Sequence, residues 1–276
     1  MPLCITWGLA LIVSKDKKIS SKSLLIFIHH SSGYIPKIVE KYIQELAIYV
    51  DDVILSTNYN GFYDLPYSLF STKNEGYDFG YFYKALQSVR NEKYDRIIFA
   101  NDSNILVSTF EKVFKWSRTC QFGVWGLTDS VEHQSEVHVH KRYHVQSHFL
   151  VFEKKAIPFL YNFFEAIRFE KNFLSKEGAS PELRKRVIIK CEYGLTQYMK
   201  ESNIKAGAMW SVKNWKPMKD KDINMHFWKW EELIKSGYPL MKKKIYDGTW
   251  DKSNNGPEGW PQLPNYGNRW KYIKNE

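Results

Sequence analysis

The chain has 276 residues, 16% of them aromatic, and its 40 Lys and Arg against 30 Asp and Glu give a net charge of +10. This aromatic-rich composition excludes a disordered, a collagen-like or a coiled-coil chain, and the length is ample to bury a core. The three cysteines (Cys4, Cys120 and Cys191) are too few for a disulfide framework, which favours a reducing compartment.

The first half of the chain alternates apolar runs with amphipathic helical patterns. Leu24–Ile28 is apolar at every position, which is typical of a strand buried on both faces of a parallel sheet. After Pro36, apolar side chains recur at steps of three and four, which predicts a helix. This alternating order predicts an α/β fold with a parallel sheet and right-handed crossovers. The further elements expected here are strands at Val53–Ser56 and Ile97–Ala100 and helices after Asp78 and at Phe110–Arg118.

The second half is less regular, and it contains no internal repeat and no long linker. We therefore expect one domain with an elaborated carboxyl-terminal portion and an irregular tail beyond Asp247, rich in Asn, Gly, Pro and Trp. The expected strands are Phe122–Thr128, Gln146–Phe152 and Ala206–Trp210, and the expected helices are Ile157–Phe169, Arg184–Glu201 and Glu231–Lys243, the last broken by Gly237 and Pro239.

The amino-terminal stretch predicts neither a membrane span nor a signal peptide. Met1–Ser14 is uncharged but shorter than the roughly 20 apolar residues that a spanning helix needs, and no Lys or Arg precedes its apolar run. We expect a cytoplasmic protein. Its charge indicates an anionic partner (a nucleic acid, a phosphorylated ligand or an acidic membrane face), unless it only reflects a Lys-rich proteome.

Polar side chains follow three of the predicted parallel strands, at the carboxyl ends where open parallel sheets bind ligands. A carboxylate at Asp102 can hold a divalent cation against a diphosphate, although an aspartate that only forms a turn is the commoner case. The other candidate ligand-binding residues at these strand ends are His30, Ser31, Asn58, Asn101 and Ser103.

Two further segments could carry chemistry. A glycine-containing loop, Asn74–Gly80, enters a predicted helix and could approach an anion, although Asp78 could simply cap that helix. Its spacing matches neither a Walker loop nor the dinucleotide fingerprint. Five of the eight histidines lie between His133 and His148, but no cysteine joins them and no zinc spacing is met, so a solvated polar segment is the better interpretation.

Seven segments, in this order, resemble the rhamnan synthesis protein F family of bacterial polysaccharide glycosyltransferases. The resemblance implies a GT-A-like (Rossmann-like) fold, with a mostly parallel sheet flanked by helices, and sugar transfer from a nucleoside-diphosphate sugar. The segments are Ile26–Pro36, Asn74–Leu86, Tyr94–Ser103, Trp125–Ser130, His144–Ile157, Cys191–Met199 and Asn224–Lys243.

The resemblance also implies roles for single residues. Asp102 takes the place of the Asp-x-Asp motif that binds metal and diphosphate in GT-A enzymes, although the second Asp is absent here. Glu192 resembles the base of inverting enzymes, with Asp129 as its rival, and His226 resembles a late histidine that completes a Mg²⁺ or Mn²⁺ site. The remaining expected contacts are Asn74, Gly76 and Asp78 with the nucleotide-sugar, and Trp125, Gln146 and Ser147 with the sugar or acceptor.

On this interpretation, residues 24–120 bind the donor, 121–245 carry catalysis and acceptor binding, and 246–276 form the tail. The acceptor is a growing cell-surface polysaccharide or a lipid-linked glycan, and the sugar is rhamnose or another hexose. The basic surface fits peripheral docking at the inner face of the cell membrane. The alternatives are a basic nucleic-acid-binding protein and a catalytically inactive GT-A domain that binds glycans.

Overall fold

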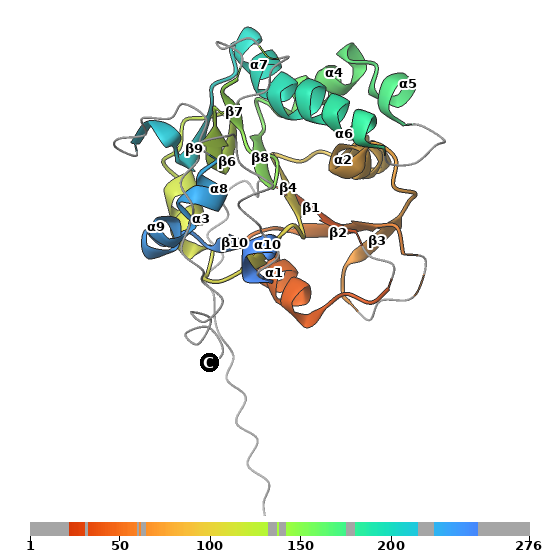
Figure 1. Cartoon of the computed structure of the whole chain (residues 1–276). Coiled ribbons are helices and arrows are strands. Elements are labelled where there is room, and N and C mark those ends of the chain that lie inside the picture. The colour runs from red at the N-terminus through yellow and green to blue at the C-terminus, as the bar shows by residue number, and fades with distance from the viewer. Residues whose placement is uncertain are drawn as a thin grey trace, which may run out of the picture.

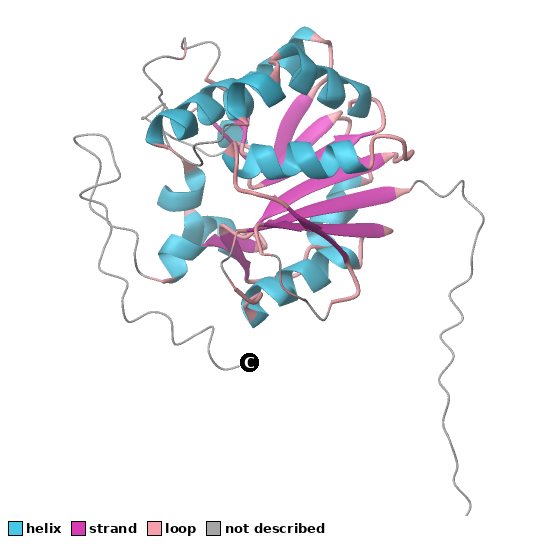
Figure 2. Ribbon diagram, turned by 90° about the vertical axis from the view of Figure 1, so that its right-hand side faces the viewer, coloured by secondary structure: helices cyan, strands magenta, loops and turns pink. Residues whose placement is uncertain are grey.

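A computed structural model describes residues 22–30, 33–59, 61, 65–131, 137, 142–174, 180–214 and 224–247 of the chain. Within them an eight-stranded sheet lies between two layers of helices (Figure 1, Figure 2). The strand order is β3-β2-β1-β4-β8-β6-β7, with β9 paired to β6. The strands are β1 (Ser23–His29), β2 (Asp52–Thr57), β3 (Ser68–Ser71), β4 (Arg96–Asn101), β6 (Val124–Ser130), β7 (His144–Val145), β8 (Phe149–Glu153) and β9 (Ala206–Trp210).

The sheet is mostly parallel, as the sequence predicted. Strand β1 pairs in parallel with β2 and β4, β2 with β3, and β6 with β9. Strand β8 runs antiparallel between β4 and β6, and β7 runs antiparallel to β6. The predicted α/β, Rossmann-like fold class is therefore confirmed, and β8 is the reversed strand inside it.

Alternate residues of β1 enter two different cores, which explains its continuous apolar run. Leu24 and Ile26 pack in the core beneath α2 and α4 to α7, whereas Leu25 and Phe27 pack in the core beneath α1, α3, α8 and α9 (Figure 1). The helices are α1 (Lys37–Ala47), α2 (Tyr77–Ser88), α3 (Glu111–Ser117), α4 (Ile157–Ala166), α5 (Phe169–Phe173), α6 (Pro181–Val187), α7 (Gly194–Glu201), α8 (Met225–Trp228), α9 (Trp230–Lys235) and α10 (Lys243–Tyr246), with a π-helical segment η2 (Ile188–Tyr193) and a short 3₁₀ helix η3 (Val212–Asn214).

Two predicted helices are interrupted. The helix expected at Ile157–Phe169 divides into α4 and α5 at Arg168, whose φ of 50° breaks the α-helical path. The helix expected at Arg184–Glu201 begins at Pro181, where the Ser180 hydroxyl accepts from the backbone N–H of Leu183, and it contains the π-helical segment η2. Both breaks are backbone features that the spacing of apolar residues does not reveal.

The helix predicted over Glu231–Lys243 breaks near Gly237, as expected, but its continuation to Lys243 is wrong. Gly237 takes a φ of 86°, which ends α9, and the chain then extends as β10 (Leu240–Lys242). Strand β10 pairs antiparallel with β5 (Asn104–Leu106), which directly follows β4. This small sheet places a run of lysines beside the carboxyl end of β4. The predicted tail beyond Asp247 lies outside the described residues.

Across the described parts of the chain, none of the helices combines the length and the apolarity needed to cross a membrane.

Candidate active site

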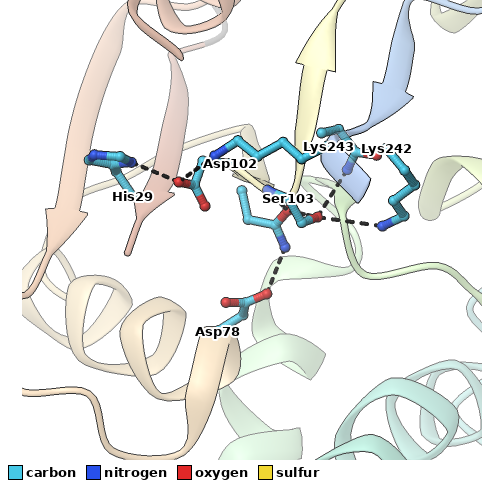
Figure 3. A network of polar contacts seen from close by, with 8 residues as sticks. His29, Asp78, Asp102, Ser103, Lys242 and Lys243 are labelled. Carbon is cyan, nitrogen blue, oxygen red and sulfur yellow. Dashed lines mark hydrogen bonds and ion pairs between the residues drawn. The ribbon is translucent and has the colours of Figure 1, made fainter. Parts of the chain in front are cut away.

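The carboxylate of Asp102 comes directly after β4 and has two close partners. Its Oδ2 atom lies 2.8 Å from His29 Nδ1 at the end of β1 and 2.9 Å from Lys243 Nζ at the start of α10 (Figure 3). Because a carboxylate only accepts, His29 Nδ1 carries the proton of this hydrogen bond. Burial opposes ionisation of Asp102, but the His29 hydrogen bond and the Lys243 charge outweigh it and hold the pKa of Asp102 below its usual value.

Asn101 connects this strand end to helix α2. Its Nδ2 donates to Asp78 Oδ2 at 2.7 Å, and its Oδ1 accepts from the backbone N–H and the hydroxyl of Ser103 at 3.1 and 2.6 Å. Lys242 Nζ lies 3.5 Å from the Ser103 hydroxyl oxygen (Figure 3). Both the Nδ2 and the Oδ1 atom of Asn101 therefore form hydrogen bonds, and these bonds hold Asp78 against the loop after β4.

The loop before α2 owes its shape to two glycines. Gly76 has a φ of 78°, a conformation that favours glycine, and Tyr77 after it has a φ of 54°. A Cβ on Gly80 would lie 1.6 Å from the carbonyl oxygen of Glu75, so the loop can fold back on α2 only if that residue is glycine. This backbone path directs Asp78 toward Asn101.

Asp78 ionises less readily than an ordinary aspartate. Burial, followed by the negative charges of Asp102 and Glu192, raises the pKa of Asp78 to about 6, although Lys242 and the Asn101 hydrogen bond oppose the shift. Asp102 and Glu192 are therefore close enough to Asp78 to affect its protonation.

Glu192 lies in the π-helical segment and accepts a hydrogen bond of 2.8 Å from the Ser147 hydroxyl. Burial raises the pKa of Glu192, and the Ser147 bond and the charges of Lys242 and Arg184 reduce the shift. A π-helical turn holds more residues than an α-helical one and so rotates the side chains that it carries; such turns are frequent at functional sites. The helical pattern in the sequence leaves Glu192 off the apolar stripe, whereas in the structure it lines a cavity.

Two adjoining cavities meet at Glu192. The first, about 370 Å³ in volume, is called here the lysine cavity, and the second, about 650 Å³, the Tyr77 cavity. They share a wall made of Asp78, Arg184, Ile188 and Glu192. The lysine cavity is further lined by Asn101, Ser103, Gln146, Ser147, Lys242 and Lys244, and the Tyr77 cavity by Tyr77, Phe79, Pro181 and Lys185.

A third cavity, of about 550 Å³, lies beside Lys22 and Tyr94 at the amino ends of β1 and β2. It includes none of the predicted site residues. Ligands of open α/β sheets bind at the opposite, carboxyl edge, so the two cavities at Glu192 are the candidate site.

Other predicted donor-binding residues lie along the same edge. His30 is exposed, and its Nε2 accepts from Asn74 Nδ2 at 2.8 Å, which joins the end of β1 to the loop before α2. Asn58 is half-buried directly after β2. Ser31 lies outside the described residues.

Asp102, His226, Asp129 and Trp125 are among the predicted residues that line neither cavity, and the last two are fully buried. Asp129 is fully buried, and its two oxygens accept from the Ser211 hydroxyl at 2.6 Å and the backbone N–H of Val212 at 2.7 Å. Trp125 is also fully buried, and its indole N–H donates to Glu153 at 2.9 Å. Neither face of its ring is open to a ligand, which does not favour the expected contact of Trp125 with the sugar or acceptor.

The residues predicted to hold a metal do not fit a divalent cation. An ammonium group already occupies the Oδ2 side of Asp102, and His226 is buried with its Nε2 at the Tyr238 hydroxyl, which also lies 2.9 Å from His148 Nε2. Burial lowers the pKa of both histidines, so they are neutral. Among the residues that the structure describes, no three His, Cys, Asp or Glu side chains gather as a metal would need, and the segment with His138 and His140 lies outside them.

Sequence reasoning missed the basic residues of the site. Lys242, Lys243 and Lys244 stand in one run, which is the signal that could have identified them, but no role in the site was expected for any of the three. Arg184 was placed only inside a helix. Their approach to Asp78, Asp102 and Glu192 depends on the β5–β10 pairing and on the π-helical segment, neither of which the sequence pattern predicts.

Comparison with known proteins gives distant similarities. No family model matches the chain. Two curated sequences from Vibrio anguillarum, both called virulence protein VirA, are 24% identical to it over 69% of this chain, and the match spans 64% of their own length, which is less than two thirds.

Similar solved structures include 4-diphosphocytidyl-2C-methyl-D-erythritol synthase from Anaerococcus prevotii (TM-score 0.40, 13% identity, 73% of this chain and 94% of that one). Another is the inositol-1-phosphate CTP transferase from T. maritima (TM-score 0.38, 12% identity, 79% and 98%). Likenesses this weak do not bear on what the chain binds.

Proposed function

We propose that this chain is a glycosyltransferase that moves a sugar, rhamnose or another hexose, from a nucleoside-diphosphate donor to a glycan acceptor. One observation carries the proposal: Glu192, a carboxylate with a raised pKa, stands in the wall between two cavities at the carboxyl edge of the sheet. A transferase needs a compartment for each substrate and a base between them. The rhamnan synthesis protein F resemblance points to the same reaction.

The donor occupies the lysine cavity. Its diphosphate lies at the end of β4, near Asn101 and Ser103, and its sugar lies toward Gln146 and Ser147. Asp78 lines this cavity and accepts from Asn101 at the end of β4, and hydrogen bonds to sugar hydroxyls are its proposed role. The acceptor enters through the Tyr77 cavity, whose aromatic and basic lining suits a glycan that carries negative charge.

The reaction is an in-line displacement. The acceptor oxygen attacks the anomeric carbon, the bond from that carbon to the phosphate oxygen breaks, and its electron pair leaves with the nucleoside diphosphate. Glu192 takes the proton of the acceptor hydroxyl, and the configuration inverts. Its raised pKa improves it as a base near neutral pH, while the Ser147 hydroxyl holds one of its oxygens. We favour Glu192 over Asp129 because both oxygens of Asp129 have backbone or hydroxyl partners away from the cavities.

The acceptor is proposed to be a growing cell-surface polysaccharide or a lipid-linked glycan. The net charge of +10 supports peripheral contact with an anionic membrane face that presents such an acceptor.

The test of this function is donor turnover. UDP-, dTDP-, GDP- and CDP-sugars are incubated with the full chain, and the release of nucleoside diphosphate is measured with and without a lipid-linked glycan fraction. We expect one base to be preferred and release to rise with acceptor. Release with none of the donors, together with binding of none, would contradict the proposal.

A further inference from the structure

The lysine run at the site is held in place by buried side chains on both sides. Met241 in β10 and Ile245 in α10 are buried together with Ile105 of β5. Strand pairing sets Lys242 opposite Asn104, and the backbone N–H of Lys243 donates to the Ser103 carbonyl at 3.1 Å. The three lysines are thus fixed on the loop after β4 and are not a free tail.

Each lysine of the run has its own place in the site. Lys243 pairs with Asp102 at 2.9 Å, whereas Lys242 and Lys244 line the lysine cavity. The positive charge of Lys242 reaches across that cavity. Burial raises the pKa values of Asp78 and Glu192, and the Lys242 charge opposes this rise. Burial lowers the pKa values of His148 and His226, and the same charge adds to this shift. Two cations therefore face the space beside Asn101 and Ser103.

A diphosphate leaving group needs such cations, because it gains negative charge as its bond to the sugar breaks. Fixed positive groups placed where that charge develops stabilise the transition state. In many phosphate sites a divalent cation on a carboxylate supplies this charge. Here the Lys243 ammonium group is paired with the carboxylate of Asp102 at the end of β4. A divalent cation at this carboxylate would be repelled by the charge of Lys243 and would overlap with its ammonium group.

We propose that Lys242 and Lys244 bind the diphosphate of the donor directly, and that Lys243 keeps Asp102 closed to a divalent cation. The inference rests on the proposed function and names the groups that stabilise its leaving group. Phosphate oxygens accept charged hydrogen bonds from the two lysines, and the bond between sugar and phosphate breaks with its electrons on the oxygen that they face. Binding and turnover then need no divalent cation.

The test compares nucleoside diphosphates with the matching monophosphates by titration calorimetry on the full chain, in EDTA. UDP, dTDP, GDP and CDP are the probes, and UMP, dTMP, GMP and CMP are their controls. Only the diphosphates carry the second phosphate, so the ratio of the two Kd values reports contacts to it. The variants are Lys242→Met, Lys244→Met and the charge-preserving Lys244→Arg. Lys235→Met, at an exposed lysine in α9 outside both cavities, removes the same charge as a matched control.

We expect one diphosphate to bind without metal, and Lys242→Met or Lys244→Met to weaken it by roughly tenfold or more, the usual loss for a charged hydrogen bond. Monophosphate binding should change little, Lys244→Arg should restore most of the loss, and Lys235→Met should have no effect.

Two results would overturn the inference, and only the second would also overturn the proposed function. If a diphosphate binds only with Mn²⁺ and the ratio is unchanged in Lys242→Met and Lys244→Met, the lysines do not replace a cation, while the proposed transferase stands. If no nucleotide binds the wild-type chain with or without Mn²⁺, the proposed function itself fails.

Discussion

The hydroxyl of Ser147 lies 2.8 Å from Glu192 Oε1, although the two residues are 45 positions apart in the chain. This hydrogen bond joins the turn before β8 to the π-helical segment, and it holds the proposed base at the wall between the two cavities. It also favours the ionised form of Glu192, which burial disfavours. The pair therefore sets both the position and the basicity of the carboxylate.

The first prediction concerns this pair. In Ser147→Ala the bond to the ionised carboxylate is lost, so the pKa of Glu192 rises further. The acidic limb of the pH profile of kcat/KM should move to higher pH by about half to one unit, since a hydrogen bond is worth about 1 kcal/mol. An acidic limb that stays in place would show that Glu192 is not the group whose ionisation limits activity. Ser147→Thr, which keeps a hydroxyl, serves as the control.

The second prediction concerns Asp78 and stability. Its pKa of about 6 lies above the ordinary 3.8, so between these values the folded chain binds more protons than the unfolded chain. The free energy of unfolding therefore falls as the pH rises through this window. Above the window, the ionised Asp78 lowers that free energy by a constant amount. Asp78→Asn can still accept a hydrogen bond from Asn101 but cannot ionise. We therefore expect this variant to unfold at a higher temperature than the wild-type chain at pH 7.5, with a free energy of unfolding that is larger by up to about 3 kcal/mol.

The sign of this effect is checked by lowering the pH. Thermal unfolding of both proteins at pH 7.5 and pH 5 should show the advantage of Asp78→Asn shrinking at the lower pH, where the wild-type carboxyl is mostly protonated. An advantage that is absent, or that grows at pH 5, would contradict the raised pKa.

The third prediction concerns Lys243. Lys243→Met removes the ammonium group from Asp102 and leaves a carboxylate that accepts from His29. Because the repelling charge is gone, this variant should gain stabilisation by Mn²⁺ in the presence of a nucleoside diphosphate, whereas the wild-type protein should show little. Thermal unfolding with Mn²⁺ and with EDTA measures both. A wild-type chain that responds to Mn²⁺ as strongly as the variant would contradict the exclusion of the cation by Lys243.

The fourth prediction separates structure from chemistry at Asp129. In Asp129→Ala the Ser211 hydroxyl and the Val212 N–H lose a buried acceptor, which costs roughly 1–3 kcal/mol for each group left unsatisfied. We expect a lower unfolding temperature, with the activity of the folded fraction retained. A folded Asp129→Asn protein that has lost turnover would instead make Asp129 the base.

Much of the fold could be predicted from the sequence, because it depends on local patterns. The run Leu24–Ile28 is apolar at every position since β1 is buried on both faces, and the helix after Pro36 follows its apolar stripe. The reversed direction of β8 could not be predicted, because parallel and antiparallel strands of a buried sheet have similar patterns. Strand β10, three residues long, was hidden within a helical pattern.

Local sequence patterns indicated the candidate site only at strand ends, whereas Asp78, Gln146, Ser147 and Glu192 were expected there from the family resemblance. Asp102, Asn101 and Ser103 were identified because they follow a buried strand. The contact between Asp102 and Lys243 joins residues 141 positions apart, and no pattern in the sequence pairs them. Glu192 was ambiguous for a different reason: helical spacing assumes α-helical geometry, and the π-helical segment breaks that assumption.

Turnover by Glu192→Gln is the most direct measurement of the central claim. This variant keeps the size of the side chain and an oxygen for the Ser147 hydroxyl, but it cannot take a proton. With the preferred nucleoside-diphosphate sugar and a glycan acceptor, kcat should fall by about 10²- to 10⁴-fold, the usual contribution of a positioned base, while diphosphate binding is kept. A Glu192→Gln protein that releases nucleoside diphosphate at the wild-type rate would contradict the account.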